Sequence, residues 1–145
     1  MPAALKLESK DMEKTYIDKL AFIELRDRKV LETKSLGKDT WYIPGGKRDG
    51  QETDEQALIR EVKEELDVDI DPSTIVLYGI FEAQAHGKPE GTVVRMTCYQ
   101  AQYSGNLTPS AEVELMDWFD YSKKDITSPV DQIIFDDLKA KDLID

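Results

Sequence analysis

The sequence is poor in two residue types that build many common sites and cross-links. Among its 145 residues there is a single cysteine, Cys98, and a single histidine, His86. One cysteine excludes an intramolecular disulfide and suits a reducing compartment. Because its neighbours are apolar, we expect Cys98 to be a small buried side chain in a strand and not a nucleophile. We expect His86, beside Gly87, to be an exposed loop residue and not a base.

The chain also lacks a long apolar run and a basic tract. No stretch approaches the roughly 20 residues of a membrane span, and the start MPAALKLESKDMEK has no apolar core of the kind found in secretory signals. Acidic residues outnumber basic ones by 30 to 19, which gives a net charge of −11. This balance disfavours binding to long nucleic acid, and it repels an anionic ligand unless a metal screens the site. We expect a soluble, cytoplasmic protein.

Length and composition indicate one domain. The chain has 40% hydrophobic residues and shows no internal repeat, linker or low-complexity segment. We therefore expect residues 1–145 to form a single domain, in which the polar first fifteen residues are either an arm or an extra edge strand.

Strand and helix signals follow one another in a mixed order. Apolar and β-branched runs bounded by turn residues predict strands over Tyr16 to Leu25, Lys29 to Thr33, Thr40 to Ile43, Thr74 to Ala85, Thr92 to Tyr103 and Glu114 to Phe119. The first two read as a pair, and the fourth and fifth as a long hairpin. A last helix is capped by Ser128 and begins at Pro129. This order predicts an α/β fold, an α/β/α sandwich with a mixed β-sheet.

The most informative segment, residues 46–68, reads GKRDGQETDEQALIREVKEELDV. Thr53 is a good N-cap, and Gln56 falls where its side chain reaches back to the cap, so a helix is predicted to begin at Asp54. At about 100° per residue, one stripe of that helix is apolar and suited to a core. The stripe consists of Leu58, Val62 and Leu66, widened by Ile59.

A second arc of the same helix is acidic. Glu61, Glu64 and Glu65 fall within about 100° of one another around the axis. Like charges three and four residues apart disfavour an isolated helix. The arrangement therefore has two readings, a solvated acidic face or a cluster that holds a counter-charge. A hard divalent cation with oxygen ligands would supply that charge.

Taken together, these spacings resemble the Nudix box of MutT-like hydrolases, Gx5Ex7REUxEExGU with U aliphatic. Gly46, Glu52 and the run from Arg60 to Val68 match it, except that Asp67 stands where the family has glycine. Aspartate tolerates the left-handed conformation of a helix end better than most residues. The preceding Pro44-Gly45-Gly46 also looks like the family's lead-in to its box.

The resemblance implies an enzyme, a metal-dependent pyrophosphohydrolase of nucleotides that uses Mg²⁺ or Mn²⁺. It carries Glu61, Glu64 and Glu65 over as metal ligands, with the carbonyl of Gly46 completing the shell and Glu61 also orienting or deprotonating the water. Glu52 and Arg60 are expected to support the site, with the Arg60 fork holding the loop on the helix.

Residues outside the box form a second tier of candidates. Glu112 lies in a context similar to a late loop where some family members keep an extra metal ligand or base, and the alternative is an exposed carboxylate. Lys47 and Arg95 are candidate phosphate contacts, although surface charge is the commoner explanation. Three aromatic residues are candidate stacking surfaces for a base that are more often simply core. They are Trp41, Phe81 and Tyr99.

The substrate is less well defined by the sequence. A proline about sixteen residues after the box looks like ADP-ribose hydrolysis and a tyrosine there like dinucleoside polyphosphate hydrolysis, but this chain has Gln84-Ala85-His86. We therefore expect a nucleoside or deoxynucleoside triphosphate, cleaved to monophosphate and pyrophosphate. The alternatives are an ADP-ribose or other nucleotide-sugar pyrophosphatase, a non-catalytic binding or regulatory module, and a non-hydrolytic branch such as an isomerase. A homodimer is expected only because many relatives pair.

Overall fold

A computed structural model describes residues 14–145 of the chain. Its elements are β1 (Thr15–Phe22), β2 (Leu25–Arg26), β3 (Lys29–Ser35), β4 (Gly45–Gly46), α2 (Asp54–Leu66), β5 (Asp69–Ile70), the 3₁₀ turn η1 (Pro72–Thr74), β6 (Val76–Gln84), β7 (Thr92–Gln100), β8 (Tyr103–Ser104), β9 (Val113–Phe119), the 3₁₀ turn η2 (Tyr121–Ile126) and α3 (Pro129–Ala140). The arm or edge strand expected over residues 1–15 lies outside the described residues, apart from the start of β1. No helix within residues 14–145 is long and apolar enough to cross a membrane.

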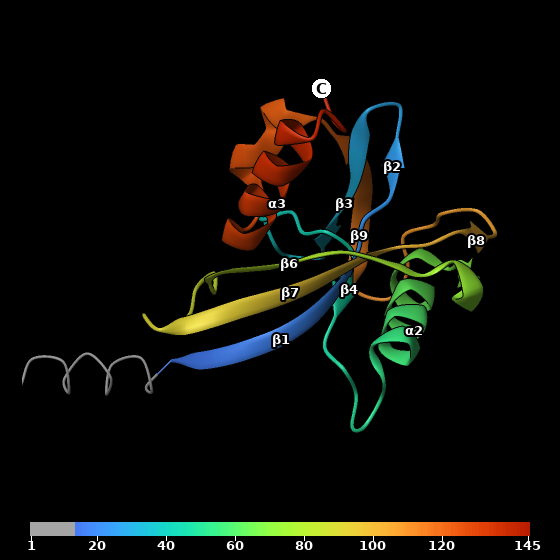
Figure 1. The fold of residues 1–145 in the computed structure, drawn as a ribbon, viewed down its shortest axis with the longest axis horizontal. Coiled ribbons are helices and arrows are strands. Elements are labelled where there is room, and N and C mark those ends of the chain that lie inside the picture. The colour runs from blue at the N-terminus through green and yellow to red at the C-terminus, as the bar shows by residue number, and fades with distance from the viewer. Residues whose placement is uncertain (1–13) are drawn as a thin grey trace, which may run out of the picture.

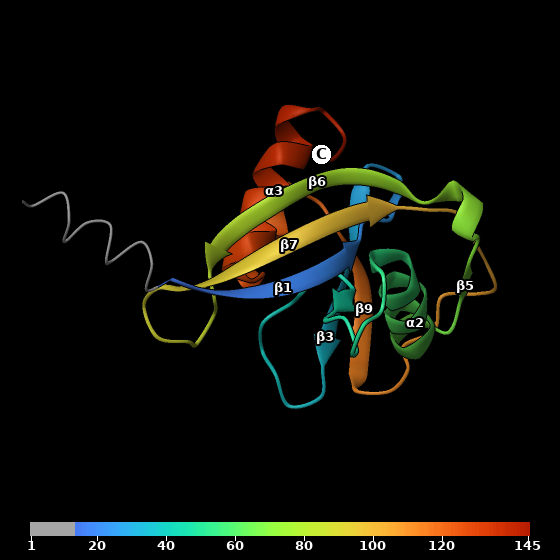
Figure 2. The ribbon, with the colours of Figure 1, turned by 60° about the horizontal axis from the view of Figure 1, so that its bottom comes forward.

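The strands form a layer between α2 and α3 (Figures 1 and 2). Four of them make a mixed sheet in the order β4-β1-β7-β6, in which β1 runs parallel to β7 and the other neighbours are antiparallel. A second sheet, β2-β3-β9, is antiparallel, and β5 pairs with β8. The α/β/α sandwich is confirmed, with its strands divided between these sheets.

Alternate residues of β1 pack against different helices, as expected for a strand buried on both faces. Leu20 and Phe22 lie in one core with the apolar stripe of α2, namely Leu58, Val62 and Leu66. Ala21 and Ile23 lie in a second core with Ile134, Phe135 and Leu138 of α3. The strand β1 therefore joins both halves of the molecule.

The predicted pairing of Tyr16 to Leu25 with Lys29 to Thr33 is wrong for most of its length. β1 instead pairs in parallel with β7 from Thr15 to Phe22, and only Leu25–Arg26 pairs with β3. At the crossover, the Ile23 N–H donates to the Tyr99 carbonyl. Because β7 takes the hydrogen bonds of the first segment, the chain leaves one sheet and joins the other just before the Asp27–Arg28 turn.

The predicted strand Thr40 to Ile43 is also wrong. Trp41 and Tyr42 make only isolated bridges, to Thr127 and Thr33. The Trp41 N–H donates to Ile126 and the Tyr42 N–H to Thr33, so neighbouring residues bond to different elements and no ladder forms.

The local signals at the helix ends are confirmed. Thr53 and Gln56 form the reciprocal capping box of α2, and Ser128 caps α3, which begins at Pro129. Asp67 ends α2 in the left-handed conformation, at φ 56° and ψ 38°. The hairpin of β6 and β7 and the strand β9 also lie where they are predicted. Cys98 is fully buried in β7, where burial raises the pKa of its thiol.

A pair of buried carboxyl groups lies between β3 and α3. Glu32 and Asp131 are both fully buried. Asp131 Oδ2 accepts a hydrogen bond of 2.7 Å from the Ile43 N–H, whereas both Glu32 oxygens lack a hydrogen-bond partner in the described part of the chain. Burial and the facing Asp131 raise the pKa of Glu32, and burial raises that of Asp131 to about 6. Glu32 is therefore the group that retains a proton at neutral pH.

Replacing Asp67 by glycine should stabilise the protein. The left-handed conformation costs a non-glycine residue about 1 kcal/mol, and glycine removes that cost while adding some entropy to the unfolded chain. With about 3 °C per kcal/mol for a chain of this size, we expect Asp67→Gly to raise the melting temperature by about 2 °C. Asp67→Ala is the control and should lower it. A glycine variant that melts below the wild type would contradict this account.

Replacing Glu32 by glutamine should remove a pH dependence of stability. A carboxyl group whose pKa is raised on folding contributes stability fully below its unfolded pKa, and this contribution is lost as the pH rises through the folded pKa. We therefore expect thermal melts to show little difference between wild type and Glu32→Gln near pH 4, and a variant more stable by a few degrees near pH 8. The exposed Glu90→Gln serves as control, and parallel pH profiles for all three proteins would contradict the prediction.

Candidate functional site

The site begins where β4 packs against β1. Gly45 and Gly46 pair with Ala21 and Leu20 in antiparallel register. A Cβ atom on Gly45, whose φ is +151°, would overlap the Leu20 carbonyl oxygen, and one on Gly46 would lie 2.6 Å from the Glu61 carboxylate. Gly45 is therefore required by its close approach to the backbone of β1, whereas a Cβ on Gly46 would meet only the flexible end of the Glu61 side chain on α2.

Arg60 ties the loop between β4 and α2 to the helix. Its guanidinium donates two hydrogen bonds of 2.8 Å to the two oxygens of Glu52 and one of 3.0 Å to the Lys47 carbonyl. It also donates to Glu61 at 2.9 Å and approaches Glu64 at 3.4 Å. The hydrogen bonds from Arg60 lower the pKa of Glu52 to about 2, so this carboxylate is ionised at neutral pH.

The three box glutamates differ in their surroundings. Glu64 is half exposed, Glu61 is mostly covered, and Glu65 is only 6% exposed. Burial raises the pKa of Glu65 to about 8 against the opposing effect of the Gly45 N–H, which donates to its carboxylate at 3.3 Å. Burial also raises the pKa of Glu61 despite Arg60. Both groups would be held more easily as anions beside a cation.

A late loop brings Glu112 to the same place. The N–H groups of Thr108 and Ser110 donate to the carbonyls of Leu66 and Glu65, at 2.8 and 2.9 Å, and so fasten this loop to the end of α2. Glu112 lies close enough to add to the raised pKa values of Glu61 and Glu65. It belongs to the group around Gly46, together with the two buried box glutamates.

The carboxylate and carbonyl oxygens at this site suit a hard divalent cation, although the side chains do not converge on one point as the ligands of a bound metal do. Carboxylates and a backbone carbonyl are the oxygen ligands that Mg²⁺ and Mn²⁺ prefer. Within residues 14–145, however, no three acidic, histidine or cysteine side chains converge at ligand spacing. Arg60 holds one oxygen of Glu61. A cation at Gly46 would therefore compete with this guanidinium for Glu61.

A polar cleft of about 710 Å³ opens beside these carboxylates. Its wall includes Gly45, Gly46 and three acidic side chains, those of Asp39, Glu65 and Glu112. The wall also includes residues of β1, β3, β7 and β9, of the loop between β3 and β4, and of the loop between β6 and β7. The cleft is large enough for a nucleotide-sized ligand.

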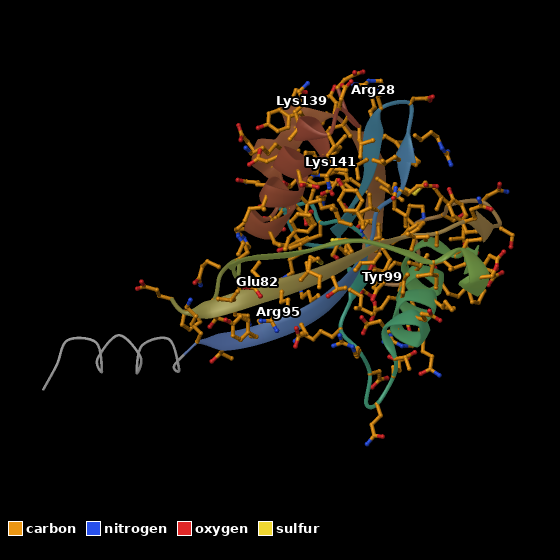
Figure 3. The ribbon with its side chains drawn as sticks, in the orientation of Figure 1. Arg28, Glu82, Arg95, Tyr99, Lys139 and Lys141 are labelled. Carbon is orange, nitrogen blue, oxygen red and sulfur yellow. The ribbon has the colours of Figure 1, made fainter. Side chains whose placement is uncertain are left out.

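Three residues predicted as substrate contacts are not among those that line the cleft. Trp41 packs on Phe119, with ring centroids 4.9 Å apart, and is not part of the cleft wall. Arg95 lies on the open face of β7, where it pairs with Glu82 at 2.6 Å (Figure 3). Lys47 is exposed on the loop after Gly46.

The other two aromatic candidates make structural contacts. The hydroxyl of Tyr99, at the edge of α2 in Figure 3, donates to Asp54 at 2.7 Å and so links β7 to the start of the helix. Phe81 packs against the core on the α3 side and lies 6.3 Å from Tyr78, ring to ring.

The structure adds three lysines that sequence reasoning missed. Lys19, Lys38 and Lys88 line the cleft, with the exposed His86 next to them. A signal for Lys19 is present in the sequence, because one face of β1 alternates as Ile17, Lys19 and Ala21, with Ile23 just after the strand. A lysine in an apolar series suggests a side chain that lies against a cavity. Lys38 and Lys88 lie in loops, where exposed lysines carry no such signal.

Comparisons with known proteins agree on one family. The model of the NUDIX domain matches residues 20–136. Among curated proteins, the chain is 32% identical over 68 residues to an 8-oxo-dGTP diphosphatase of Proteus vulgaris. That match covers 47% of this chain and 56% of the relative, so the similarity spans little more than half of the relative's length.

Solved structures share the fold. The ORF135 protein of E. coli superposes with a TM-score of 0.68 at 22% identity, over 90% of this chain and 95% of that one. The MutT protein of Methanosarcina mazei gives 0.67 at 17% identity, over 89% and 96%. A MutT NUDIX hydrolase of Burkholderia pseudomallei gives 0.62 at 23% identity, over 75% and 86%.

Alanine substitutions at Gly45 and Gly46 should differ in their cost to stability, because one contact is with backbone and the other with a side chain. Gly45→Ala places Cβ on a backbone oxygen that cannot move, which we expect to cost about 3 kcal/mol or more. Gly46→Ala meets only the end of the Glu61 side chain, which can turn away. At about 3 °C per kcal/mol, thermal melts should show a loss of about 10 °C for Gly45→Ala and less than a third of that for Gly46→Ala. Equal losses would contradict the described packing.

Proposed function

This chain belongs to the NUDIX family, and we propose that it is a metal-dependent pyrophosphohydrolase of nucleoside or deoxynucleoside triphosphates. Members of this family generally use divalent cations and act on small nucleotides. The observation that carries the proposal is the group of Glu61, Glu65 and Glu112 near the Gly46 backbone, beside a nucleotide-sized cleft that Gly46, Glu65 and Glu112 line.

The proposed reaction is a hydrolysis. An oxygen of water bonds to a phosphorus of the substrate, the bridging bond between the α- and β-phosphates breaks, and monophosphate and pyrophosphate leave, with the water's proton passing to a base. A divalent cation bound there would neutralise phosphate oxygens and lower the pKa of bound water. Mg²⁺ or Mn²⁺ fits the oxygen donors. Glu61, Glu64, Glu65 and the Gly46 carbonyl would hold it.

The remaining site residues take roles that follow from their contacts. Glu61, with its pKa raised by burial, is suited to take the proton of the attacking water or to orient that water. Glu112 faces the same point from the late loop and would add a ligand or a second base. Arg60 and Glu52 hold the loop and the helix together through their paired hydrogen bonds. They act on the reaction by positioning Glu61.

The triphosphate assignment rests on two supports. The curated relative from Proteus vulgaris is named for an 8-oxo-dGTP substrate, and the chain lacks the downstream residues that mark ADP-ribose or dinucleoside polyphosphate hydrolysis in the family. The isomerase reading is disfavoured because the thiol of Cys98 is fully buried.

Hydrolysis of a substrate panel tests the proposal. The panel contains nucleoside triphosphates, 8-oxo-dGTP, ADP-ribose and a dinucleoside polyphosphate at millimolar Mg²⁺ or Mn²⁺, with phosphate release measured with and without added pyrophosphatase. We expect turnover of a triphosphate that depends on the metal and releases pyrophosphate. Turnover of ADP-ribose alone would replace the substrate assignment. No turnover of any compound would favour a binding module.

Substitution of the box glutamates tests the residues. Glu61→Gln and Glu64→Gln should each lower turnover about 100-fold or more, as removal of a catalytic base or metal ligand does, with unchanged circular dichroism and melting temperature within a few degrees. Glu55→Gln, on an exposed part of the same helix, is the matched control. Wild-type turnover in both box variants would show that the site is assigned incorrectly.

A further inference from the structure

The cleft is lined by three lysines as well as by the carboxylates of Asp39, Glu65 and Glu112. Lys19 comes from β1, Lys38 from the loop between β3 and β4, and Lys88 from the loop between β6 and β7. None of the three forms an ion pair within residues 14–145, although acidic residues are in excess over the whole chain. Three separate segments thus bring unpaired lysines to one wall.

Lys19 is the most constrained of the three. It is half-buried, on the face of β1 that otherwise carries Ile17, Ala21 and Ile23. Burial lowers its pKa and the nearby charge of Lys47 lowers it further, while Asp131 and Glu65 oppose this shift and Lys88 adds the smallest lowering effect. Cations gathered in this way repel one another, and an anion bound between them would relieve that repulsion.

Lys19 and Lys88 also stand where the wide cleft meets a smaller pocket. Both residues line each cavity, and the smaller one is walled mainly by apolar groups such as Val94, Met96 and Pro129. Lysine binds phosphate as a mobile point charge with three donors.

We propose that Lys19, Lys38 and Lys88 bind the phosphates of the substrate that are not held at the carboxylates, and thereby select triphosphates over diphosphates. The inference rests on the proposed function and adds its source of specificity. A triphosphate carries about four negative charges near neutral pH, and one divalent cation balances only two of them. The lysines supply charge for the remainder, which is larger for a triphosphate than for a diphosphate bound with the same cation.

Binding of inorganic tripolyphosphate provides a test that does not need turnover. By calorimetry with Mg²⁺ present, we expect Lys19→Gln and Lys88→Gln each to weaken binding about tenfold, the loss of one charge-assisted contact, and Lys19→Arg to bind nearly as the wild type does. The matched control is Lys139→Gln, an exposed lysine at the far end of α3, near the C-terminus (Figure 3). Equal affinities of the wild type, both cleft variants and the control would overturn the proposal.

Kinetics provide the second arm. For a triphosphate that the wild type hydrolyses, kcat/KM should fall about tenfold in Lys19→Gln and in Lys88→Gln, and the fall should be smaller for the matching diphosphate. An unchanged preference for triphosphate would overturn the role of the lysines while leaving the proposed hydrolysis intact. If the wild type hydrolyses none of the nucleotides, the proposed function is wrong. The tripolyphosphate binding measurement then tests by itself whether the lysines bind phosphate.

Discussion

The close approach of Gly45 and Gly46 to β1 on one side and to α2 on the other is the constraint on which the site depends. β1 is buried on both faces and pairs with β7, so its backbone cannot move away from the glycines. The Glu61 carboxylate then lies directly against the Gly46 backbone. Any larger residue at either position would separate the carboxylates from the backbone carbonyl with which they are proposed to share a cation.

The charged side chains around the site differ in how far they are paired within the protein. On α2, Arg60 satisfies Glu52 twice and reaches Glu61 only once. Glu52 is thereby kept ionised and has a structural role. Glu61 and Glu65 have raised pKa values, so a nearby cation would stabilise their ionised forms. The same cleft is lined by three lysines that form no ion pair within residues 14–145. A metal with a polyphosphate would supply opposite charge to the carboxylates and to the lysines.

Local features of the fold were predictable from the sequence, and pairing between distant segments was not. The capping box at Thr53, the left-handed Asp67 and the Ser128-Pro129 start of α3 depend on residues within one turn. The parallel pairing of β1 with β7 joins segments about 75 residues apart. The apolar pattern of β1 is the same whether it pairs with β7 or with β3, so it does not identify the partner. The strand predicted at Thr40 to Ile43 failed for a related reason, because its N–H groups bond to two different elements.

The same division applies to the candidate site. Spacing along α2 identified the box carboxylates, and the structure places Glu112 beside them. Lys19, Lys38 and Lys88 come from three separate segments, so only the folded chain shows that they share a wall. Trp41 and Arg95 have suitable chemistry, but the fold turns one into the core and the other onto an open strand face.

Binding of Mn²⁺ to the free protein, measured by electron paramagnetic resonance, tests for a metal site at Gly46 and Glu61 without a substrate or turnover. We expect the wild type to bind Mn²⁺ and Glu61→Gln to weaken this binding about tenfold or more, while Glu55→Gln leaves it unchanged. Equal Mn²⁺ affinity in all three proteins would contradict a metal site at Gly46 and Glu61.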